Sequence, residues 1–355
     1  MNHKPKRPVL RRAFITELGT ATLIATSSRP ILGANDRIGL GVIGCGERGR
    51  SHIQLIKQLK ESGEAVEITA LCDIYRPRSK KLESEASGQF YMHHQELLQD
   101  PRVDAVLIAT PDHWHGYQVL DAIDAGKDVF CEKPITHWRQ RDLTRRLFDT
   151  VRDRNRVVQV GVQSMSSSAW RQAAKLIQRG DIGRPLHVQA GYFCNRDMEK
   201  SMPIEDPQAL PGKDLLWDVF LGDSPNRTYN VSRFFQWKLY WDYAGGPSTC
   251  DFPLVLTPIV RMLEIAFPEA VMASGGCYFS SSKREVPDTF NMMIDYLKGP
   301  SVVLTCTVGN DTGIPLLIRG SEGTLMFDRE NIRIVPQPNS KRPQKIDPIQ
   351  RKESL

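Results

Sequence analysis

Short apolar runs alternate with amphipathic stretches through the first half of the chain. The run at residues 38–43 is continuous, as in a buried strand, whereas residues 51–60 carry apolar side chains at helical spacing. By the same pattern we expect strands at 66–72, 105–109, 129–131 and 157–160, and helices at 115–125 and 139–155. Strands that alternate with helices of this length predict an α/β protein with a doubly wound parallel sheet covered on both faces.

The pattern changes after Gly161. One helix is expected at 169–179, and the long irregular stretch at 195–247 is too aromatic to be disordered. Strand-like runs follow the helix at 186–193, 271–279, 290–297, 301–308, 316–319, 324–327 and 332–335. They predict a second domain with an antiparallel or mixed sheet. We therefore divide the chain into a leader at 1–34, a Rossmann domain at 35–160, a second domain at 161–340 and a tail at 341–355.

The positive charge of the chain is concentrated at its start. The formal net charge is +6, and residues 1–34 hold six Lys and Arg against one Glu, so the remainder is almost neutral. No basic stripe is left to indicate a nucleic-acid partner. Arg11 and Arg12 precede a mildly apolar stretch and a cleavage-like sequence ending at Ala34, which predicts a Tat-type signal and a periplasmic protein. The alternative is a disordered basic tail on a cytoplasmic protein, since the apolar stretch is too short and polar for a stable membrane span.

The seven cysteines are scattered along the chain without a Cys-x-x-Cys pair. Zinc and redox motifs are therefore not expected, and we predict no metal site. Several cysteines lie in apolar strand contexts, where Cys usually packs as a small hydrophobic residue.

A glycine-rich turn follows the first expected strand. Gly44, Gly46 and Gly49 form Gly-x-Gly-x-x-Gly at the start of a helix, the context in which this motif binds a dinucleotide pyrophosphate. Asp73 ends the second strand, where a carboxylate accepts hydrogen bonds from ribose hydroxyls and repels a 2′-phosphate. NAD is therefore the expected cofactor. NADP stays open because two arginines, Arg76 and Arg78, follow closely, and a plain helix cap is the alternative role for Asp73.

Two further strand ends at the same sheet edge carry polar residues. The strand at 105–109 is followed by Thr110-Pro111-Asp112-His113-Trp114-His115. Asp112 is expected to cap the next helix. Glu132, Lys133 and Pro134 follow the strand at 129–131, and a lysine in a partly desolvated crevice could donate to a substrate oxygen or move a proton. The alternatives are packing or capping histidines and a surface ion pair between Glu132 and Lys133.

These motifs resemble the Gfo/Idh/MocA family of oxidoreductases. The matching residues are Gly44-x-Gly46-x-x-Gly49, Asp73, Pro111-Asp112-x-x-His115, Ala125-Gly126-Lys127, Glu132-Lys133-Pro134, Gly161-Val162-Gln163, Ile182-Gly183, Gly245-Gly246-Pro247 and Ser321-Glu322-Gly323-Thr324. The resemblance covers residues 37–335. It implies an N-terminal Rossmann domain and a C-terminal α+β domain with a large, mostly antiparallel open sheet, assembled as a dimer or tetramer.

The resemblance also implies a reaction and a set of site residues. The reaction is hydride transfer between a nicotinamide and a carbinol of a sugar, polyol or glycoside, with Lys133 as the active-site lysine. The cofactor-binding residues would be Gly44, Gly46, Glu47, Arg48, Gly49, Asp73, Thr110, Pro111, Asp112, His115, Glu132, Lys133 and Gln163.

An aromatic stretch at residues 234–243 fits a sugar substrate, because flat rings stack on the C–H faces of pyranoses. The candidate substrate residues are Arg233, Trp237, Tyr240, Trp241 and Asp242. An aromatic core or an oligomer contact is the equal alternative, since aromatic residues also dominate buried surfaces.

The chain departs from the family where a catalytic histidine is expected. Family members usually carry Asp-x-x-x-His on the helix after a glycine turn, and the His takes the carbinol proton. One register here gives Cys250 and Leu254, and the other gives Asp251 and Val255. The candidate substitutes for the missing base are Asp251, Tyr240, His113 and Lys133.

Two other functions therefore stay open. One is an NAD-dependent glycosidase, which oxidises a sugar transiently, eliminates the glycosidic substituent and takes the hydride back. Lys133 argues against it, because a Glu-Val-Pro-like run commonly replaces Glu-Lys-Pro in such relatives. The other is a cofactor-binding protein that has lost turnover. The family also commonly continues into another helix past a stretch like residues 351–355, so we expect a truncated C-terminus.

Overall fold

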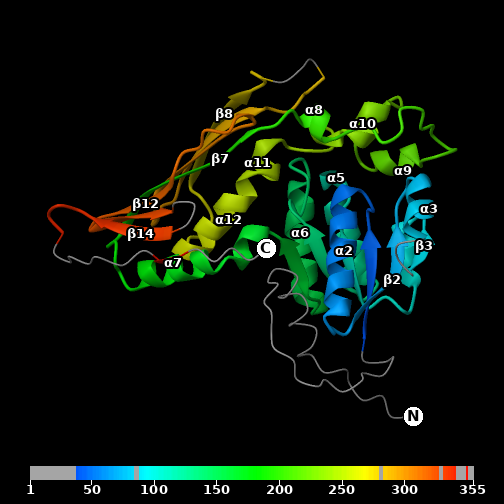
Figure 1. The fold of residues 1–355 in the computed structure, drawn as a ribbon, viewed down its shortest axis with the longest axis horizontal. Helices are drawn as coiled ribbons and strands as arrows, with labels where there is room; N and C mark the ends of the chain where they lie inside the picture. Colours follow the sequence, from blue (N-terminus) through cyan, green and yellow to red (C-terminus); the bar gives the residue numbers. More distant parts are fainter. Residues whose placement is uncertain (1–36, 84–87, 280–282, 328–330, 341–348, 351–355) are drawn as a thin grey trace, which may run out of the picture. The chain divides into compact units, whose positions relative to one another are not determined.

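The computed structural model describes residues 37–83, 88–279, 283–327, 331–340 and 349–350 (Figure 1). The expected leader at 1–34 and the expected tail, apart from 349–350, lie outside these ranges. The described chain forms two compact units. The first contains residues 37–161 and 202–244, and the second contains 162–201 and the residues from 245 onward. No helix in the described ranges is both long enough and apolar enough to cross a membrane.

The first unit is built on a parallel sheet. Its described strands follow the order β3-β2-β1-β4-β5-β6, and each neighbouring pair is parallel. The bounds are β1 (Ile38–Ile43), β2 (Val66–Cys72), β3 (Gln89–Tyr91), β4 (Ala105–Ile108), β5 (Asp128–Glu132) and β6 (Val158–Gly161). The predicted doubly wound parallel sheet is confirmed. Strand β3 was not predicted, because its three residues are too few to form a pattern.

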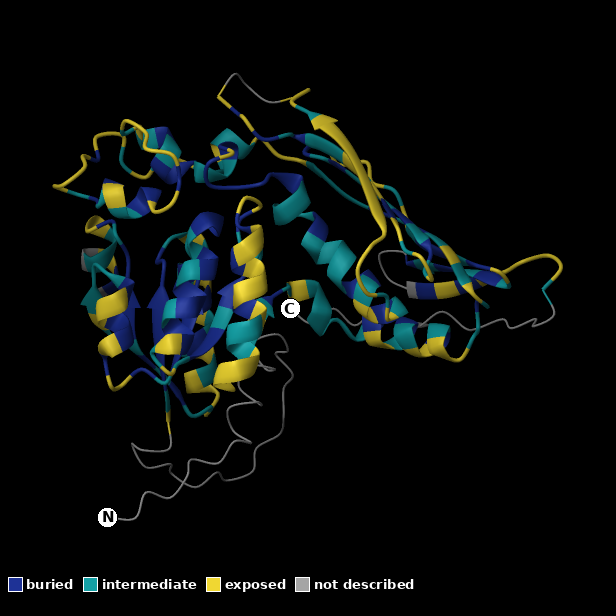
Figure 2. Cartoon of the chain, turned by 180° about the vertical axis from the view of Figure 1, so that it is seen from behind, coloured by how far each residue is buried: buried dark blue, intermediate teal, exposed yellow. Residues whose placement is uncertain are grey.

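Helices cover both faces of this sheet. They are α2 (Glu47–Glu61), α3 (Pro77–Glu83), α4 (His94–Gln99), α5 (Asp112–Asp124) and α6 (Arg141–Arg154). Adjacent strand residues point to opposite sides, so Leu40 and Val42 of β1 pack with α2, whereas Ile43 packs with α4, α5 and α6. Figure 2 shows the strands buried between helices whose outer sides are exposed.

The segment 202–244 belongs to the first unit, although the sequence placed it in the second domain. It contains α9 (Trp217–Leu221), α10 (Val231–Phe235) and the 3₁₀ helix η3 (Trp237–Leu239). Its aromatic side chains attach it to segments that follow two strands of the Rossmann sheet: the Phe235 ring lies 5.3 Å from that of Tyr75, after β2, and the Phe220 ring lies 5.3 Å from that of His113, on α5. The aromatic residues that distinguish this segment from an ordinary loop thus also hold it on the first unit.

The second unit contains a larger, mostly antiparallel sheet. The described strands follow the order β15-β14-β13-β12-β7-β10-β9-β8, and β11 pairs with the end of β7. Only the β7–β10 pair among them is parallel. The bounds are β7 (Pro185–Asn195), β8 (Ala270–Gly276), β9 (Thr289–Asp295), β10 (Ser301–Thr307), β11 (Gly309–Asn310), β12 (Leu316–Gly320), β13 (Gly323–Phe327), β14 (Asn331–Pro336) and β15 (Ile349–Gln350). The predicted fold class is confirmed.

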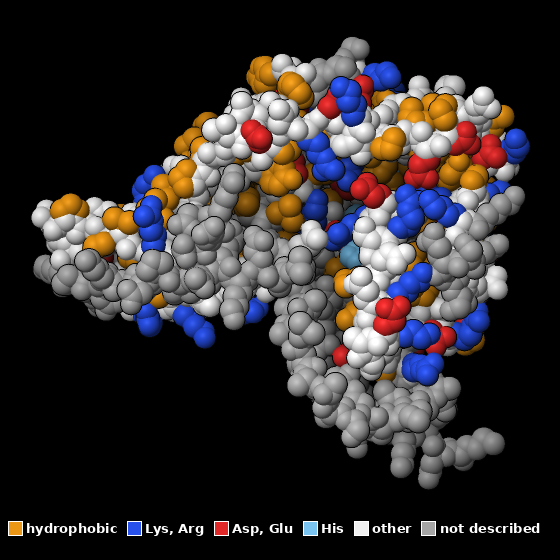
Figure 3. Space-filling model, viewed as in Figure 1, with side chains coloured by type: hydrophobic (Ala, Val, Ile, Leu, Met, Phe, Trp, Pro, Cys, Tyr) orange, Lys and Arg blue, Asp and Glu red, His pale blue; other side chains and the backbone are white. Residues whose placement is uncertain are grey.

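Two helices cover one face of the second sheet. The helical elements of this unit are η2 (Gln163–Ser166), α7 (Ser168–Gln178), α8 (Met198–Ser201), α11 (Pro247–Cys250) and α12 (Phe252–Leu263). Trp170 of α7 and Ile259 of α12 share a buried cluster with alternate strand residues such as Val188 and Val302. Strand β8 is largely exposed (Figure 2). In Figure 3 hydrophobic side chains are visible among polar ones along this unit, and acidic and basic side chains are interspersed on the first unit.

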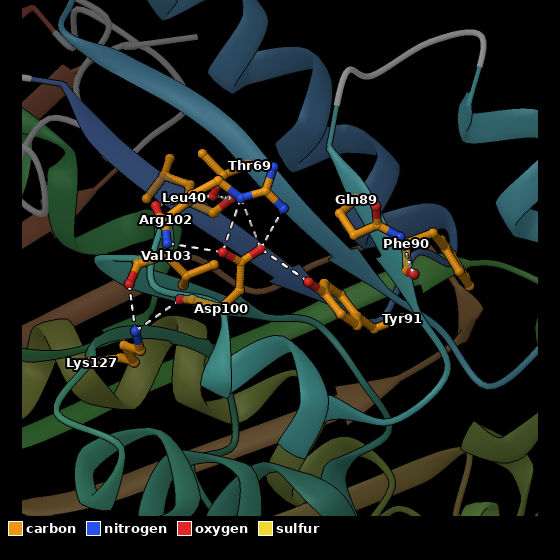
Figure 4. A network of polar contacts seen from close by, with 9 residues as sticks. All are labelled: Leu40, Thr69, Gln89, Phe90, Tyr91, Asp100, Arg102, Val103 and Lys127. Carbon is orange, nitrogen blue, oxygen red and sulfur yellow. Dashed lines mark hydrogen bonds and ion pairs between the residues drawn. The ribbon is translucent and has the colours of Figure 1, made fainter. Parts of the chain in front are cut away.

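A buried carboxylate organises the loop that leads into β4 (Figure 4). Asp100 accepts hydrogen bonds from Arg102 Nη2 at 2.7 Å, from the Arg102 backbone N–H at 2.9 Å and from Tyr91 Oη at 3.1 Å. Lys127 Nζ donates to the carbonyl oxygens of Asp100 and Val103. The hydrogen bonds from Arg102 lower the pKa of Asp100 to about 2, against the opposing effect of burial. This network joins the segments that enter β4 and β5.

We expect Asp100→Asn to destabilise the protein by about 1–3 kcal/mol, because it replaces a buried charged acceptor with a partly mismatched amide. The folded-state pKa is depressed, so this stabilisation is present above pH 4 and lost as the pH falls from about 4 to about 2. Urea unfolding from pH 7 to pH 2.5 measures the difference from wild type, which should shrink at the acid end. Asp153→Asn, in an exposed ion pair with Arg152, is the matched control and should change stability by less than about 0.5 kcal/mol. Equal effects of the two substitutions would contradict this account.

Candidate functional site

The carboxyl ends of four strands in the first unit bring most of the predicted residues to one edge. In a parallel sheet all strands end at the same edge, and the chain reverses its winding direction between β1 and β4. Gly44, Asp73 and Lys133 directly follow β1, β2 and β5, and Thr110 is the second residue after β4. Gln163 and Asp251 belong to the second unit, in η2 and before α12.

The glycine turn has the shape that a dinucleotide needs. Gly44 has φ +88°, and a Cβ there would lie 2.8 Å from the backbone of Ala109. A Cβ on Gly49 would lie 1.9 Å from the carbonyl oxygen of Gly44, so only glycine lets α2 approach β1 this closely. A Cβ on Gly46 would make only ordinary van der Waals contact, with Arg78 Nη1 the nearest atom at 3.7 Å.

The start of α2 suits a pyrophosphate. Gly46 is the N-cap and provides no side-chain hydrogen bond to the first turn. The first N–H groups of any helix lack partners within the helix, and together with the helix dipole they favour an anion. Gly46 permits close approach there. The residues present therefore fit NAD at this position.

Asp73 is buried at the end of β2 and holds the turn together. Its Oδ2 accepts from the Cys45 N–H at 2.8 Å and from Arg78 Nη1 at 3.0 Å, and its Oδ1 accepts from the Tyr75 N–H at 2.9 Å. Arg78 also donates to Glu205 at 3.1 Å. Two carboxylates thus share the charge of Arg78, the arginine that could have favoured a 2′-phosphate.

Glu132 pairs with residues of α2, and not with Lys133 as in the alternative interpretation of a surface ion pair. Its Oε1 accepts from Arg48 Nε at 2.7 Å and lies 2.7 Å from His52 Nε2. Burial raises the pKa of Glu132, but the hydrogen bond from His52 and the charge of Arg48 outweigh it and lower the pKa to about 2. Arg48 and Glu132, both predicted to touch the cofactor, therefore contact each other.

The loop after β4 places a buried carboxyl beside two basic groups. Helix α5 begins at Asp112 itself with Pro111 as the N-cap, which corrects the prediction of Asp112 as the capping residue: Asp112 is the first residue of the helix. Asp112 is 2% exposed, and its Oδ2 has no hydrogen-bond partner. Burial raises the pKa of Asp112 to about 6, although the nearby charges of His115 and Lys133 act in the opposite direction.

His115 ties two of the site loops together. Its Nδ1 lies 2.6 Å from the carbonyl oxygen of Pro134, and its Nε2 lies 2.7 Å from that of Thr110. The imidazole therefore bridges the segment after β4 and the segment after β5. This contact fixes the loop that follows Lys133.

The candidate bases have different surroundings. His113 is fully buried, and its Nε2 lies 2.7 Å from the backbone carbonyl oxygen of Phe220. Burial lowers the pKa of His113 to about 3. A histidine that is so weakly basic is poorly suited to take a substrate proton. Tyr240 is also buried, with its Oη 2.6 Å from Ser232 Oγ. Helix α12 contains no histidine, in agreement with the departure seen in the sequence.

Most of the aromatic stretch is core. Asp242 accepts from Arg227 Nε and Arg233 Nη1, both at 3.0 Å, so two of the predicted substrate residues bind each other. Trp237 is half-buried beside Lys238. Only Trp241 of the five candidates is exposed, at 37%, and it packs edge-on against Trp138.

Two residues that bind side chains at this sheet edge, His52 and Glu205, could not be recognised from the sequence. His52 lies within an ordinary amphipathic helix pattern, and Glu205 lies in the irregular stretch, so their partners became evident only in the fold. The described residues contain no group of three or more His, Cys, Asp or Glu side chains that could hold a metal ion.

The parallel sheet, the glycine turn and the acidic residue after β2 define an NAD-binding domain of the Rossmann type. Residues 38–162 match the family model of the Gfo/Idh/MocA oxidoreductases, which is described as an oxidoreductase family with an NAD-binding Rossmann fold.

Two curated relatives that match the chain are dehydrogenases. Levoglucosan dehydrogenase of Pseudarthrobacter phenanthrenivorans is 24% identical over 312 residues, which are 82% of this chain and 74% of that protein. Inositol 2-dehydrogenase of Pseudomonas fluorescens is 34% identical over 156 residues, 43% of this chain and 45% of that protein. The chain thus matches less than half the length of the inositol enzyme.

Solved structures share the fold. A levoglucosan dehydrogenase in complex with NADH and levoglucosan has a TM-score of 0.65 at 18% identity, covering 90% of this chain and 80% of that one. The WlbA dehydrogenase of Bordetella pertussis, in complex with NADH and UDP-GlcNAcA, has a TM-score of 0.63 at 19% identity, covering 82% and 79%.

Asp112→Asn should stabilise the protein at neutral pH. The folded-state pKa of Asp112 is raised, so wild-type stability contains a penalty that is absent below pH 4 and grows as the pH rises from about 4 to about 6. The variant should exceed wild type by up to about 3 kcal/mol at pH 7, since one pKa unit corresponds to about 1.4 kcal/mol. Denaturant unfolding at pH 4 and pH 7 measures the change, and a variant less stable than wild type at pH 7 would show that the Asp112 carboxylate is stabilised in the fold.

Proposed function

We propose that this protein is an NAD-dependent dehydrogenase that oxidises a carbinol of a sugar, polyol or glycoside. The observation that carries the proposal is the placement of Lys133 at the same edge of one parallel sheet as the glycine turn and Asp73. The relatives that are named for levoglucosan and inositol support a sugar or polyol as the substrate class.

The residues of the chain would bind the cofactor and move one proton. Bound NAD would supply the hydride acceptor. The first turn of α2 and Gly46 would hold its pyrophosphate, and Asp73 would accept from the ribose hydroxyls. Lys133 would hydrogen-bond the carbinol oxygen. Asp112, on which the Lys133 charge acts, is a buried carboxyl with a pKa of about 6 and would store the proton that leaves this oxygen.

We further propose export by the Tat route, based on Arg11 and Arg12, and self-association through the second sheet. Val271, Met272 and Met293 on β8 and β9 are between 49% and 72% exposed, which gives the sheet an apolar edge suited to a second copy. Fractionation of cells tests the export, and sedimentation of the purified protein tests the self-association.

The function is tested by denaturing the purified protein, identifying any released nucleotide, and assaying levoglucosan, inositol and a panel of glycosides. Net NADH formation is the expected result. Product without net NADH would indicate the glycosidase reaction, and bound NAD without turnover would indicate a protein that has lost catalysis. If no nucleotide binds, the role given to the glycine turn is wrong.

Lys133→Met should reduce turnover by about 100-fold or more, because Lys133 acts on the substrate oxygen. The dissociation constant for NAD should stay within about threefold of the wild-type value. Lys60→Met, on the exposed last turn of α2, is the matched control and should retain activity. Retained turnover in Lys133→Met would remove the lysine from the mechanism.

Asp73→Asn should shift cofactor preference toward NADP. The variant keeps an oxygen acceptor but removes the charge that repels a 2′-phosphate and leaves Arg78 with one carboxylate partner. We expect the ratio of kcat/KM for NAD over NADP to fall by roughly tenfold, equivalent to about 1.4 kcal/mol. Nucleotide binding measured by calorimetry gives the same comparison without a substrate, and an unchanged ratio would contradict the role of Asp73.

A further inference from the structure

We propose that His52 is a positioning residue of the active site: with Arg48 it holds the Glu132 carboxylate and thereby fixes the strand end that carries Lys133 relative to the nucleotide-binding helix. The proposal rests on the proposed function of Lys133. No motif in the sequence includes His52.

The contact geometry is specific. Arg48 and His52 are four residues apart on α2, so their side chains share one face of the helix. Both reach the same atom, Glu132 Oε1, each at 2.7 Å. His52 is the more enclosed of the two, with 7% of its side chain exposed against 40% for Arg48.

The surroundings leave little room for another arrangement. The His52 ring packs edge-on against Phe130 at 5.5 Å, two residues before Glu132 on β5. On the neighbouring strand, a Cβ at Gly161 would come within 2.8 Å of the Phe130 ring and 3.4 Å of Glu132 Cδ. The β5 side chains therefore occupy the space that a larger residue would need on β6.

The carboxylate connects the two parts of the proposed reaction. Helix α2 begins at the glycine turn, where NAD would bind, and Glu132 immediately precedes Lys133. Loss of a partner from a buried ionised carboxylate is costly, and the side chain would turn toward water. Such a movement of Glu132 would also displace Lys133, the next residue in the chain. A displacement of about 1 Å at reacting groups can reduce the rate by about 100-fold.

The chain offers a matched control. His94 Nε2 lies 2.8 Å from Asp121 Oδ2, and 5% of the His94 side chain is exposed, so it is also a buried histidine paired with a carboxylate. This pair joins α4 to α5 and does not involve β5 or α2. A purely structural role predicts similar effects for the two histidines.

The experiment compares His52→Leu, His52→Gln and His94→Leu in the full chain. The Gln side chain can place an amide N–H close to the position of His52 Nε2, whereas Leu removes the donor. We expect His52→Leu to increase hydrogen exchange in a peptide covering residues 129–135 by at least about tenfold and to reduce turnover of levoglucosan or inositol by about 10- to 100-fold. The dissociation constant for NAD should change by less than about threefold. His52→Gln should restore most of both properties, and His94→Leu should leave both unchanged.

The proposal is overturned if His52→Leu exchanges like wild type at 129–135, if His94→Leu has the same effects, or if His52→Gln is as impaired as His52→Leu. Hydrogen exchange needs neither cofactor nor substrate. If wild type turns over no sugar, the proposed function fails while the contact between His52 and Glu132 is still judged by exchange. Increased exchange with unchanged turnover in an active enzyme would confine His52 to a structural role and overturn the proposal.

Discussion

The parallel sheet of the first unit imposes the constraint on which the site depends. Every strand must end at the same edge, so segments far apart in the sequence deliver their first polar residues to one place. The sheet can be formed only if helices bury both of its faces. Gly49 provides one close contact between helix and sheet, because a single added Cβ would lie 1.9 Å from the Gly44 carbonyl oxygen. The same glycine that lets α2 pack against β1 thus also aims the helix N-terminus at the cofactor position.

Three buried carboxylates lie at this edge, and their partners separate their roles. Asp73 binds Arg78 and two backbone N–H groups, so it is fixed as an acceptor beside the glycine turn. Glu132 binds Arg48 and His52 and stays ionised. Asp112 has an oxygen with no hydrogen-bond partner and a pKa raised to about 6. The pKa values of Glu132 and Asp112 are shifted in opposite directions at one sheet edge, so these two carboxyl groups suit different tasks, and Asp112 rather than Glu132 is poised to exchange a proton near neutral pH.

The sequence was sufficient to predict the sheet apart from β3, together with residues that follow its strands, because apolar runs and glycine spacing are local signals. It identified Gly44, Asp73 and Lys133, yet it could not predict which side chains pair across the edge. The interaction of Glu132 with Arg48 and His52 joins residues 80 or more positions apart. The aromatic segment shows the same limit. Its composition excluded disorder, but whether Tyr240 and Asp242 faced a sugar or the core depended on packing that no local pattern contains.

The absence of a histidine on α12 changes what the first unit must supply. In a dehydrogenase the carbinol proton must leave as the hydride departs, and neither Leu254 nor Val255 can accept it. A lysine that remains an ammonium can orient the oxygen but cannot take the proton without passing one on. Asp112 would meet that requirement in the proposed mechanism, since its carboxyl is buried, its Oδ2 has no hydrogen-bond partner, and the charge of Lys133 acts on it. Proton transfer that is divided between Lys133 and Asp112 would place the acid–base function within the Rossmann unit and free α12 from it.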